Sequence, residues 1–459
     1  MVSASGLRVA LLGWACTPEP ELTTDLISDN RVFNRTDWTA AGLVACIALT
    51  VYLATLAPSV TLEQSGAFAV AGQHLGIGRV PGYPLWHLLA KGFVTLFGFV
   101  RYRGVPNPAW ATNLMSAVFG ALSCGLVALL VARTGRAITR PPAEAGPKAF
   151  AAAVAAGLLF AVSHALWSQS VITETHTLTL FGLLLVLTAA LAWLLRPCRR
   201  TAFGLAAAFA LSLAQSHLTL LLLPCGILAL LLAEPRLCRA FCLCHAFLWL
   251  LPCVLLRMGV AGPWLGIAVG ASCVLGIALP LRLSAAGRTA LGMVGIMAAG
   301  AAAYAYLPLA AEGAAPMQFG DARTWPGFLH VLARGQYERL VPADVGSARF
   351  LGQLGWYAGL LGRQFLLPFS LAALVPVAGL SRFRGPWRAW GAVCLLAFFL
   401  FSVVMLIGAN PAGDIQDTFI QRVKFIPSFA LWSLFTGFGF ALILDWISRL
   451  TDADPADRP

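Results

Sequence analysis

The chain has 459 residues with 31 Lys+Arg against 19 Asp+Glu, and 59% of it is hydrophobic while only 11% is charged. A soluble globular domain is about half apolar and a quarter charged, so this composition excludes an ordinary cytosolic enzyme and a disordered chain. The net charge of +12 does not indicate nucleic-acid binding, because the basic residues lie in short gaps between apolar runs. The sequence therefore predicts an all-α, polytopic integral membrane protein.

A transmembrane helix needs roughly 20 mostly apolar residues to cross about 30 Å of hydrocarbon. About a dozen segments meet this requirement, and they place a transmembrane domain over residues 39–446. The predicted spans are Thr39–Ala57, Trp110–Ala132, Ala149–Leu166, Val171–Leu195, Thr201–Ser216, His217–Ala233, Ala240–Leu256, Pro263–Leu281, Thr289–Leu307, Gln364–Leu380, Ala389–Ile407 and Phe425–Trp446. Leu85–Phe99 is apolar but short for a span.

The cationic connections between spans predict the orientation, because loops rich in Lys and Arg stay in the cytoplasm. These residues are Arg133, Arg136, Arg140 and Lys148, then Arg196, Arg199 and Arg200, Arg236 and Arg239, Arg282 and Arg288, and Arg382, Arg384 and Arg388. We expect a cytoplasmic arm at 1–38 and a cytoplasmic tail at 447–459. The long segments 58–108, 308–362 and 408–424 then lie outside, and so should the chemistry.

The 11 cysteines fall mostly inside apolar segments and show neither a disulfide framework nor metal-site spacing. Cys242-Leu-Cys244-His245 is the one cluster, and helical side chains explain it better than a zinc site, whose ligands usually come as two separated pairs. The sequence contains no nucleotide-binding loop. We therefore predict neither a metal nor another firm cofactor.

The first external loop carries Glu63 directly after the first predicted span, and we expect this long loop to be helical, with Ser65–Leu75 as a helix at the membrane interface. Such a carboxylate is either a solvated anchor or a functional acid, and the residue type alone does not decide between them. The loop then reaches Pro81-Gly82-Tyr83-Pro84, where two prolines around a glycine fix a rigid bend. This bend is either a plain turn or a stiff scaffold that holds polar groups over a cavity.

Glu174 and His176 place an acid and a base near the external end of the fourth predicted span. Ionisable groups at membrane depth are expensive and mark functional sites by default. The alternative is a structural pair of the two, or a partner for an arginine such as Arg79. His217 lies in the next external turn and adds to the same face.

Cations in the later external segments could hold an anion. Asp321-Ala-Arg323-Thr324 predicts a helix N-terminus, with Asp or Thr as cap. Arg323 is then either the ion-pair partner of Asp321 or an anion hook, since a guanidinium matches a phosphate. Arg422 and Lys424, just outside the last span, could serve the same purpose or simply snorkel to the interface.

Several short motifs resemble a known multi-span family. They are Ala57-Pro-Ser-Val-Thr61, Ser65-Gly66, Leu75-Gly76, Pro81-Gly-Tyr-Pro-Leu85, Asn113-Leu114, Phe119-Gly-Ala121, Trp167-Ser-Gln-Ser-Val-Ile-Thr-Glu174, Leu211-Ser212, His217-Leu-Thr219, Tyr306-Leu-Pro308, Gly320-Asp-Ala-Arg-Thr-Trp325 and Gln336-Tyr337. Together they cover most of the chain from Ala57 to Tyr337. The pattern is similar to the transmembrane protein O-mannosyltransferases that modify plexin-type domains, within the glycosyltransferase C superfamily.

The resemblance implies an inverting transferase with a glycosyltransferase C-like fold and its catalytic acid in the first external loop. The donor would be a polyprenyl- or dolichyl-phosphate sugar, with mannose as the sugar, and the acceptor an extracytoplasmic protein or glycan. Membrane lipid is a further expected partner, and nucleic acid is not. For a bacterial-type relative, we expect the inner membrane with the active face in the periplasm.

One departure from the family pattern concerns the first loop. The family reads Asp-Ser-Gly-Glu where this chain has Gln64-Ser65-Gly66-Ala67, so both acids are missing. Glu63 could replace the Asp through a local register change, or Glu174 could supply the carboxylate. A catalytically inactive lipid-linked-sugar binder or transporter is the remaining alternative.

The leading hypothesis is an active enzyme in which Glu63 and Glu174 are the catalytic residues. The residues expected to bind donor or substrate are Gln64, Ser65, His74, Arg79, Tyr83, His176, His217, Asp321, Arg323, Arg422 and Lys424, and Pro81, Gly82 and Pro84 form the structural motif.

Overall fold

The computed structural model of the chain describes residues 31–139, 142–251, 254, 263–282, 284–313, 315–337, 341–379 and 383–452. The chain divides into two compact units, Met1–Asn34 and Arg35–Pro459, and every helix among the described residues belongs to the second. Most of the expected arm at 1–38 lies outside the described residues. The first helix of the second unit, α2 (Arg35–Ala54), begins four residues before the expected membrane domain.

The first half of the second unit is helical from its start, and α5 is its centre. Because α5 is apolar on every side, it is buried along most of its length and packs against α2, α6, α8 and α22. The Asp37 carboxylate pairs with Arg136 at 2.6 Å and ties α2 to α5. These helices are α5 (Pro108–Ile138), α6 (Pro142–Ala161), α7 (His164–Ser170), α8 (His176–Leu195), α9 (Arg199–Gln215), η1 (His217–Leu222) and α10 (Leu223–Ala233).

The second half adds a layer on each side of this centre. α14 packs on α9 and α11, while α18 packs on α22. Its helices are α11 (Pro235–His245), η2 (Ala246–Leu250), α13 (Pro263–Leu281), α14 (Ser284–Ala302), η3 (Ala303–Ala305), α15 (Tyr306–Glu312), α16 (Trp325–Leu332), α17 (Ala348–Gln364), α18 (Leu367–Ala378), α19 (Pro386–Phe399), η5 (Leu400–Val404), α20 (Met405–Ala409), α21 (Ile415–Gln421), η6 (Arg422–Phe425) and α22 (Ile426–Asp452).

Within the described residues, seven helices are long and apolar enough to cross a membrane, or eight if α17 and α18, bent by 111°, form one span. The all-α membrane fold is thus confirmed, whereas the expected dozen spans are not. The predicted span Gln364–Leu380 begins at the bend between α17 and α18, and α17 occupies the end of the expected loop 308–362. The predicted span Ala240–Leu256 starts inside α11 and ends outside the described residues.

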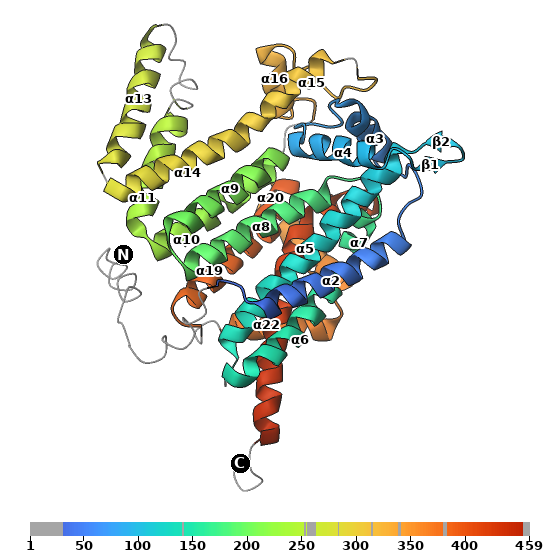
Figure 1. Cartoon of the computed structure of the whole chain (residues 1–459), viewed down its shortest axis with the longest axis vertical. Coiled ribbons are helices and arrows are strands. Elements are labelled where there is room, and N and C mark those ends of the chain that lie inside the picture. The colour runs from blue at the N-terminus through green and yellow to red at the C-terminus, as the bar shows by residue number, and fades with distance from the viewer. Residues whose placement is uncertain are drawn as a thin grey trace. The chain divides into compact units, whose positions relative to one another are not determined.

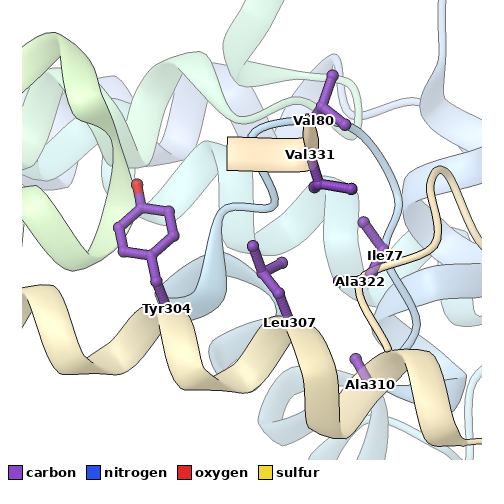
Figure 2. Close-up of a cluster of buried hydrophobic side chains, with 7 residues drawn as sticks. All are labelled: Ile77, Val80, Tyr304, Leu307, Ala310, Ala322 and Val331. Atoms are coloured by element: carbon purple, nitrogen blue, oxygen red, sulfur yellow. The ribbon is translucent and has the colours of Figure 1, made fainter. Parts of the chain in front are cut away.

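The first external loop is helical, as expected. It contains α3 (Ser65–His74), α4 (Pro84–Leu96) and a hairpin of β1 (Arg101–Tyr102) and β2 (Val105–Pro106), which lie with α15 and α16 at one end of the helix bundle (Figure 1). A buried cluster joins these segments: Ile77, Val80, Tyr304, Leu307, Ala310, Ala322 and Val331 (Figure 2). The first loop and the segment after α15 therefore fold as one layer.

Candidate active site

Glu174 lies in the break between α7 and α8, not inside a continuous fourth helix as the hydropathy predicts. The segment is fixed by side chains from two other helices. The Ser116 hydroxyl of α5 lies 3.3 Å from both the N–H and the carbonyl oxygen of Glu174, and Trp86 Nε1 of α4 donates to that carbonyl at 3.2 Å. The Glu174 side chain is consequently buried, with 4% of the residue exposed.

Asn113 of α5 joins this segment to the start of the first loop. Its amide donates to the carbonyls of Ala57 (2.9 Å) and Ser59 (3.1 Å), and its Oδ1 accepts a short hydrogen bond from the Thr173 hydroxyl. The Ala57 N–H donates to the Val171 carbonyl at 3.0 Å. The two acid-bearing segments are thus held together on the end of α5.

Glu63 occupies a tight turn before α3. Its backbone has φ 68°, a left-handed conformation that is uncommon and strained for a residue other than glycine. Ser65 fixes the turn, since its buried hydroxyl accepts from the Thr61 N–H (2.9 Å) and donates to the Thr61 carbonyl (2.8 Å). The Glu63 carboxylate is exposed, and its charge acts on both Glu174 and Arg422.

Burial changes the protonation of Glu174. Burial is the main cause that raises the pKa of Glu174 to about 7, and the neighbouring Glu63 charge raises it further. The N–H groups of Thr175 and Gln64 and the Arg79 guanidinium only partly offset this rise. A buried carboxyl group with a raised pKa is a common feature of sites for acid–base chemistry.

Three cations gather beside these acids. Arg79 Nε donates to the Tyr337 hydroxyl at 3.1 Å, and the Arg334 guanidinium lies 5.0 Å from the centre of the Tyr337 ring. The charges of Arg334 and Arg79 both act on Lys424. These three positive charges repel one another, so the binding of an anion among them would be favoured.

Two of the three predicted histidines, His176 and His217, lie close to these cations. His176 Nε2 lies 4.0 Å from Glu174 Oε2 at the start of α8, and the charges of Arg79 and Lys424 act on it. His217 follows α9, and the charge of Arg334 acts on it. Its Nδ1 is buried without a hydrogen-bond partner among the described residues.

The Pro81–Pro84 turn places Arg79 and Tyr83 near Glu174. Gly82 has φ 115°, and a Cβ there would overlap the Leu307 side chain, so only glycine fits. Tyr83 begins α4 in a left-handed conformation, and its charge environment includes Arg79, Arg334 and Glu174. The turn is therefore a scaffold rather than a plain connection.

His87 supports this turn from α4, although the sequence pattern gave it no role. Its Nε2 accepts from the Gly78 N–H at 3.1 Å, its Nδ1 lies 3.0 Å from the Tyr83 carbonyl, and its ring stacks on Tyr306. Burial lowers the pKa of His87 to about 4, so the ring is neutral and its Nδ1–H donates to Tyr83. Its spacing from Tyr83, four residues along a helix, is the signal that could have revealed it.

Several predicted residues have other roles. Arg323 pairs with Asp321 at 2.7 Å on an exposed turn, which holds the pKa of Asp321 at about 2. This satisfied pair agrees with the ion-pair alternative and argues against an anion hook. Thr324, rather than Asp321, caps α16 by accepting from the Gly327 N–H. His74 is exposed at the end of α3, while the buried Ser65 hydroxyl is hydrogen-bonded to Thr61.

The remaining candidates lie around the acids. Gln64 Oε1 and Arg422 Nε are buried without partners among the described residues, and Arg422 stacks 3.9 Å above the Phe419 ring. No group of three or more His, Cys, Asp or Glu in the described part of the chain is placed to hold a metal ion. Chemically, the site offers a carboxylate to accept a proton and cations to hold an anionic group.

Comparisons with known proteins point to one family. Residues 64–237 match the family model described as the protein O-mannosyl-transferase TMEM260 N-terminal domain. The mouse (Mus musculus) protein O-mannosyl-transferase TMEM260 is 24% identical over 432 residues, which are 90% of this chain and 52% of the mouse protein. The chain thus spans about half the length of the curated relative it matches. Because that relative is a mouse protein, it lends no support to a bacterial inner membrane.

Two solved membrane enzymes resemble the fold only distantly. An oligosaccharyltransferase from Archaeoglobus fulgidus gives a TM-score of 0.41 at 13% identity, covering 91% of this chain and 52% of its own. ArnT from Cupriavidus metallidurans, bound to undecaprenyl phosphate, gives 0.31 at 14% identity, covering 91% and 79%. Scores this low support no conclusion about ligands. Over residues 64–237, the chain is therefore similar to the N-terminal domain of the transmembrane protein O-mannosyltransferases.

Proposed function

We propose that this membrane protein is an inverting glycosyltransferase of the glycosyltransferase C type, which moves mannose from a polyprenyl-phosphate donor to a protein hydroxyl on the extracytoplasmic face. The observation that carries the proposal is the pair of acids, Glu63 and Glu174, beside the cations Arg79, Arg334 and Lys424. Glu174 lies within residues 64–237, which match the O-mannosyltransferase family model, and Glu63 directly precedes them.

In the proposed reaction, the acids and the cations have separate roles. The acceptor oxygen attacks the anomeric carbon while the bond from that carbon to the phosphate oxygen breaks, and polyprenyl phosphate leaves. Glu63, the exposed acid, takes the hydroxyl proton. Arg79, Arg334 and Lys424 stabilise the phosphate charge that develops. Glu174 and His176 shape the part of the site between Glu63 and the three cations.

The altered motif is compatible with this role for Glu63. Gln64 and Ala67 stand where the family has acids, so the loop would need its carboxylate from the preceding position. The left-handed backbone of Glu63 supports such a register change, because strained residues concentrate at functional sites. Arg422, on which the Glu63 charge acts, would help to orient it.

Transfer of radiolabelled mannose from polyprenyl-phosphate mannose by the purified protein, with membrane extract as acceptor pool, tests the proposal. We expect the wild type to transfer and Glu63→Gln to lose at least about 100-fold in rate. Glu312→Gln, which changes another exposed acid at the same end of the bundle, is the matched control and should retain activity. Transfer that survives in Glu63→Gln would remove this acid from the mechanism.

The inactive binder or transporter remains the second candidate, because both family acids of the loop are replaced. No transfer by the wild type with any lipid-linked sugar, together with flux of that sugar into proteoliposomes, would favour it. Neither result is expected if Glu63 is the catalytic base.

A further inference from the structure

The end of the first loop carries charge of a single sign. Residues 84–107 contain Lys91, Arg101 and Arg103 and no acid. Lys91 is occupied by the Gln73 carbonyl at 2.7 Å, whereas both arginines lie on the hairpin. Among the described residues, neither arginine has a carboxylate within ion-pair distance. The hairpin therefore presents two positive charges that no carboxylate in the described part of the chain neutralises.

The hairpin is ordered by its own turn. Tyr102 pairs with Val105, and Arg103 (φ 53°) and Gly104 (φ 82°) supply the left-handed residues that a tight two-residue turn needs. Arg101 donates to the Gly104 carbonyl at 3.1 Å, and the Arg103 guanidinium lies 5.5 Å from the centre of the Tyr102 ring. Both cations are thus held close to the hairpin surface.

Apolar and aromatic side chains surround these cations. Leu96, Phe99 and Val105 are 68%, 75% and 64% exposed. An aromatic row leads to them from α4: the Phe97 ring is tilted against Phe99, with centroids 6.1 Å apart, and meets Trp110 of α5 edge to face at 5.8 Å. Aromatic rings with cations at the end of a membrane helix are typical of the region where lipid headgroups meet water.

The position of α5 places the hairpin at this level. The hairpin ends two residues before Pro108, where α5 begins. From Pro108 to Ala132, α5 rises about 37 Å, slightly less than the 40–45 Å of a bilayer with its headgroups. When the apolar part of α5 crosses the hydrocarbon, the hairpin therefore lies among the headgroups.

We propose that Leu96, Phe99, Arg101, Tyr102, Arg103 and Val105 form a lipid-binding patch that takes the anionic headgroups of phospholipids in the leaflet beside the site. The apolar side chains enter the upper acyl region, and the two guanidiniums hold the phosphates. A protein partner fits less well, because these large apolar side chains already lie at the depth of lipid. The patch acts independently of the proposed transfer reaction.

The test uses the full chain in nanodiscs with equal amounts of phosphatidylglycerol and phosphatidylcholine. A photo-crosslinking amino acid replaces Val105, and mass spectrometry counts the lipid adducts. We expect phosphatidylglycerol adducts to exceed phosphatidylcholine adducts by roughly fivefold to tenfold. Arg101→Gln with Arg103→Gln should bring the ratio close to one, without loss of fold, because both side chains are exposed.

The matched control places the crosslinker at Val274 of α13, which is 64% exposed within a predicted span. Adducts there should show little preference between the two lipids. Equal yields of the two lipids at Val105, or no lipid adducts, would overturn the proposal. Loss of lipid adducts in favour of protein adducts when membrane extract is added would also overturn it and would indicate an acceptor-docking surface.

Discussion

The segment around Glu174 and the turn at Asp321–Arg323 both place charge at the same end of the molecule, yet they differ in what surrounds that charge. Glu174 is buried by bonds from α4 and α5, and its partners leave its pKa at about 7. Asp321 and Arg323 satisfy each other in solvent. The difference teaches that burial without a neutralising partner perturbs the pKa of a charged group, whereas an exposed ion pair satisfies both of its members.

The pH dependence of stability should separate these two regions most strongly. The pKa of Glu174 is raised from 4.5 to about 7, so its contribution to stability is complete below about pH 4.5 and is lost as the pH rises through 7. Glu174→Gln should therefore gain roughly 2 to 3 kcal/mol in unfolding free energy relative to wild type between about pH 5 and 8. Denaturant unfolding in detergent micelles at both pH values measures this gain.

Other titrating groups contribute to the unfolding free energy of both the wild type and Glu174→Gln, so their contributions cancel when the two proteins are compared. Asp321→Asn serves as the control, because the lowered pKa of Asp321 confines its effect to pH values below about 4. A difference between Glu174→Gln and wild type that stays constant with pH would show that Glu174 is not perturbed in the folded protein.

Substitution of Arg79 should weaken use of the lipid-linked sugar donor much more than substitution of Arg323. Arg79→Gln removes a charge held over the site by Tyr337, and we expect the KM for polyprenyl-phosphate mannose to rise about 10- to 100-fold. Arg323→Gln breaks only an exposed pair and should change KM by less than about twofold. Initial rates over a range of donor concentrations measure both values, and equal effects would contradict the assignment of the phosphate site.

Removing a supporting hydrogen-bonding side chain should destabilise the protein more in the Glu174 region than near Asp321–Arg323. This difference in unfolding free energy is the smallest of the predicted effects. Asn113→Ala leaves the Ala57 and Ser59 carbonyls and the Thr173 hydroxyl without their partner, and should lower the unfolding free energy by about 1 to 2 kcal/mol. Thr324→Ala removes only the cap of α16 and should lower it by about 0.5 to 1 kcal/mol. Thermal unfolding compares the pair, and the reverse order would show that the Asn113 network is not what holds the Glu174 segment.

The sequence predicted the fold class because membrane-spanning helices need long apolar segments, and these are visible in the sequence. It also predicted the bend at Pro81–Pro84 and the proximity of Glu174 and His176. It did not reveal the break before α8, because Val171 and Ile172 continue the apolar run while the break is imposed by Ser116 and Trp86 from elsewhere in the chain.

The residues to which sequence reasoning assigned no role in the site share one property. Asn113, His87 and Arg334 act through neighbours far along the chain or through a backbone turn, and no local pattern announces such contacts. Conversely, Asp321 and Arg323 looked functional because of their types, although a spacing of two residues lets them satisfy each other. Charge type is visible in a sequence, whereas burial is decided by the tertiary structure.

The most direct test of the central claim, that Glu63 and Glu174 form one catalytic unit, is a double-mutant cycle on mannose transfer with Glu63→Gln, Glu174→Gln and the double variant. Because the charge of Glu63 acts on Glu174, the account predicts that the double variant is no slower than about the slower single variant. Rate losses that multiply in the double variant would contradict the account and show that the two acids act independently.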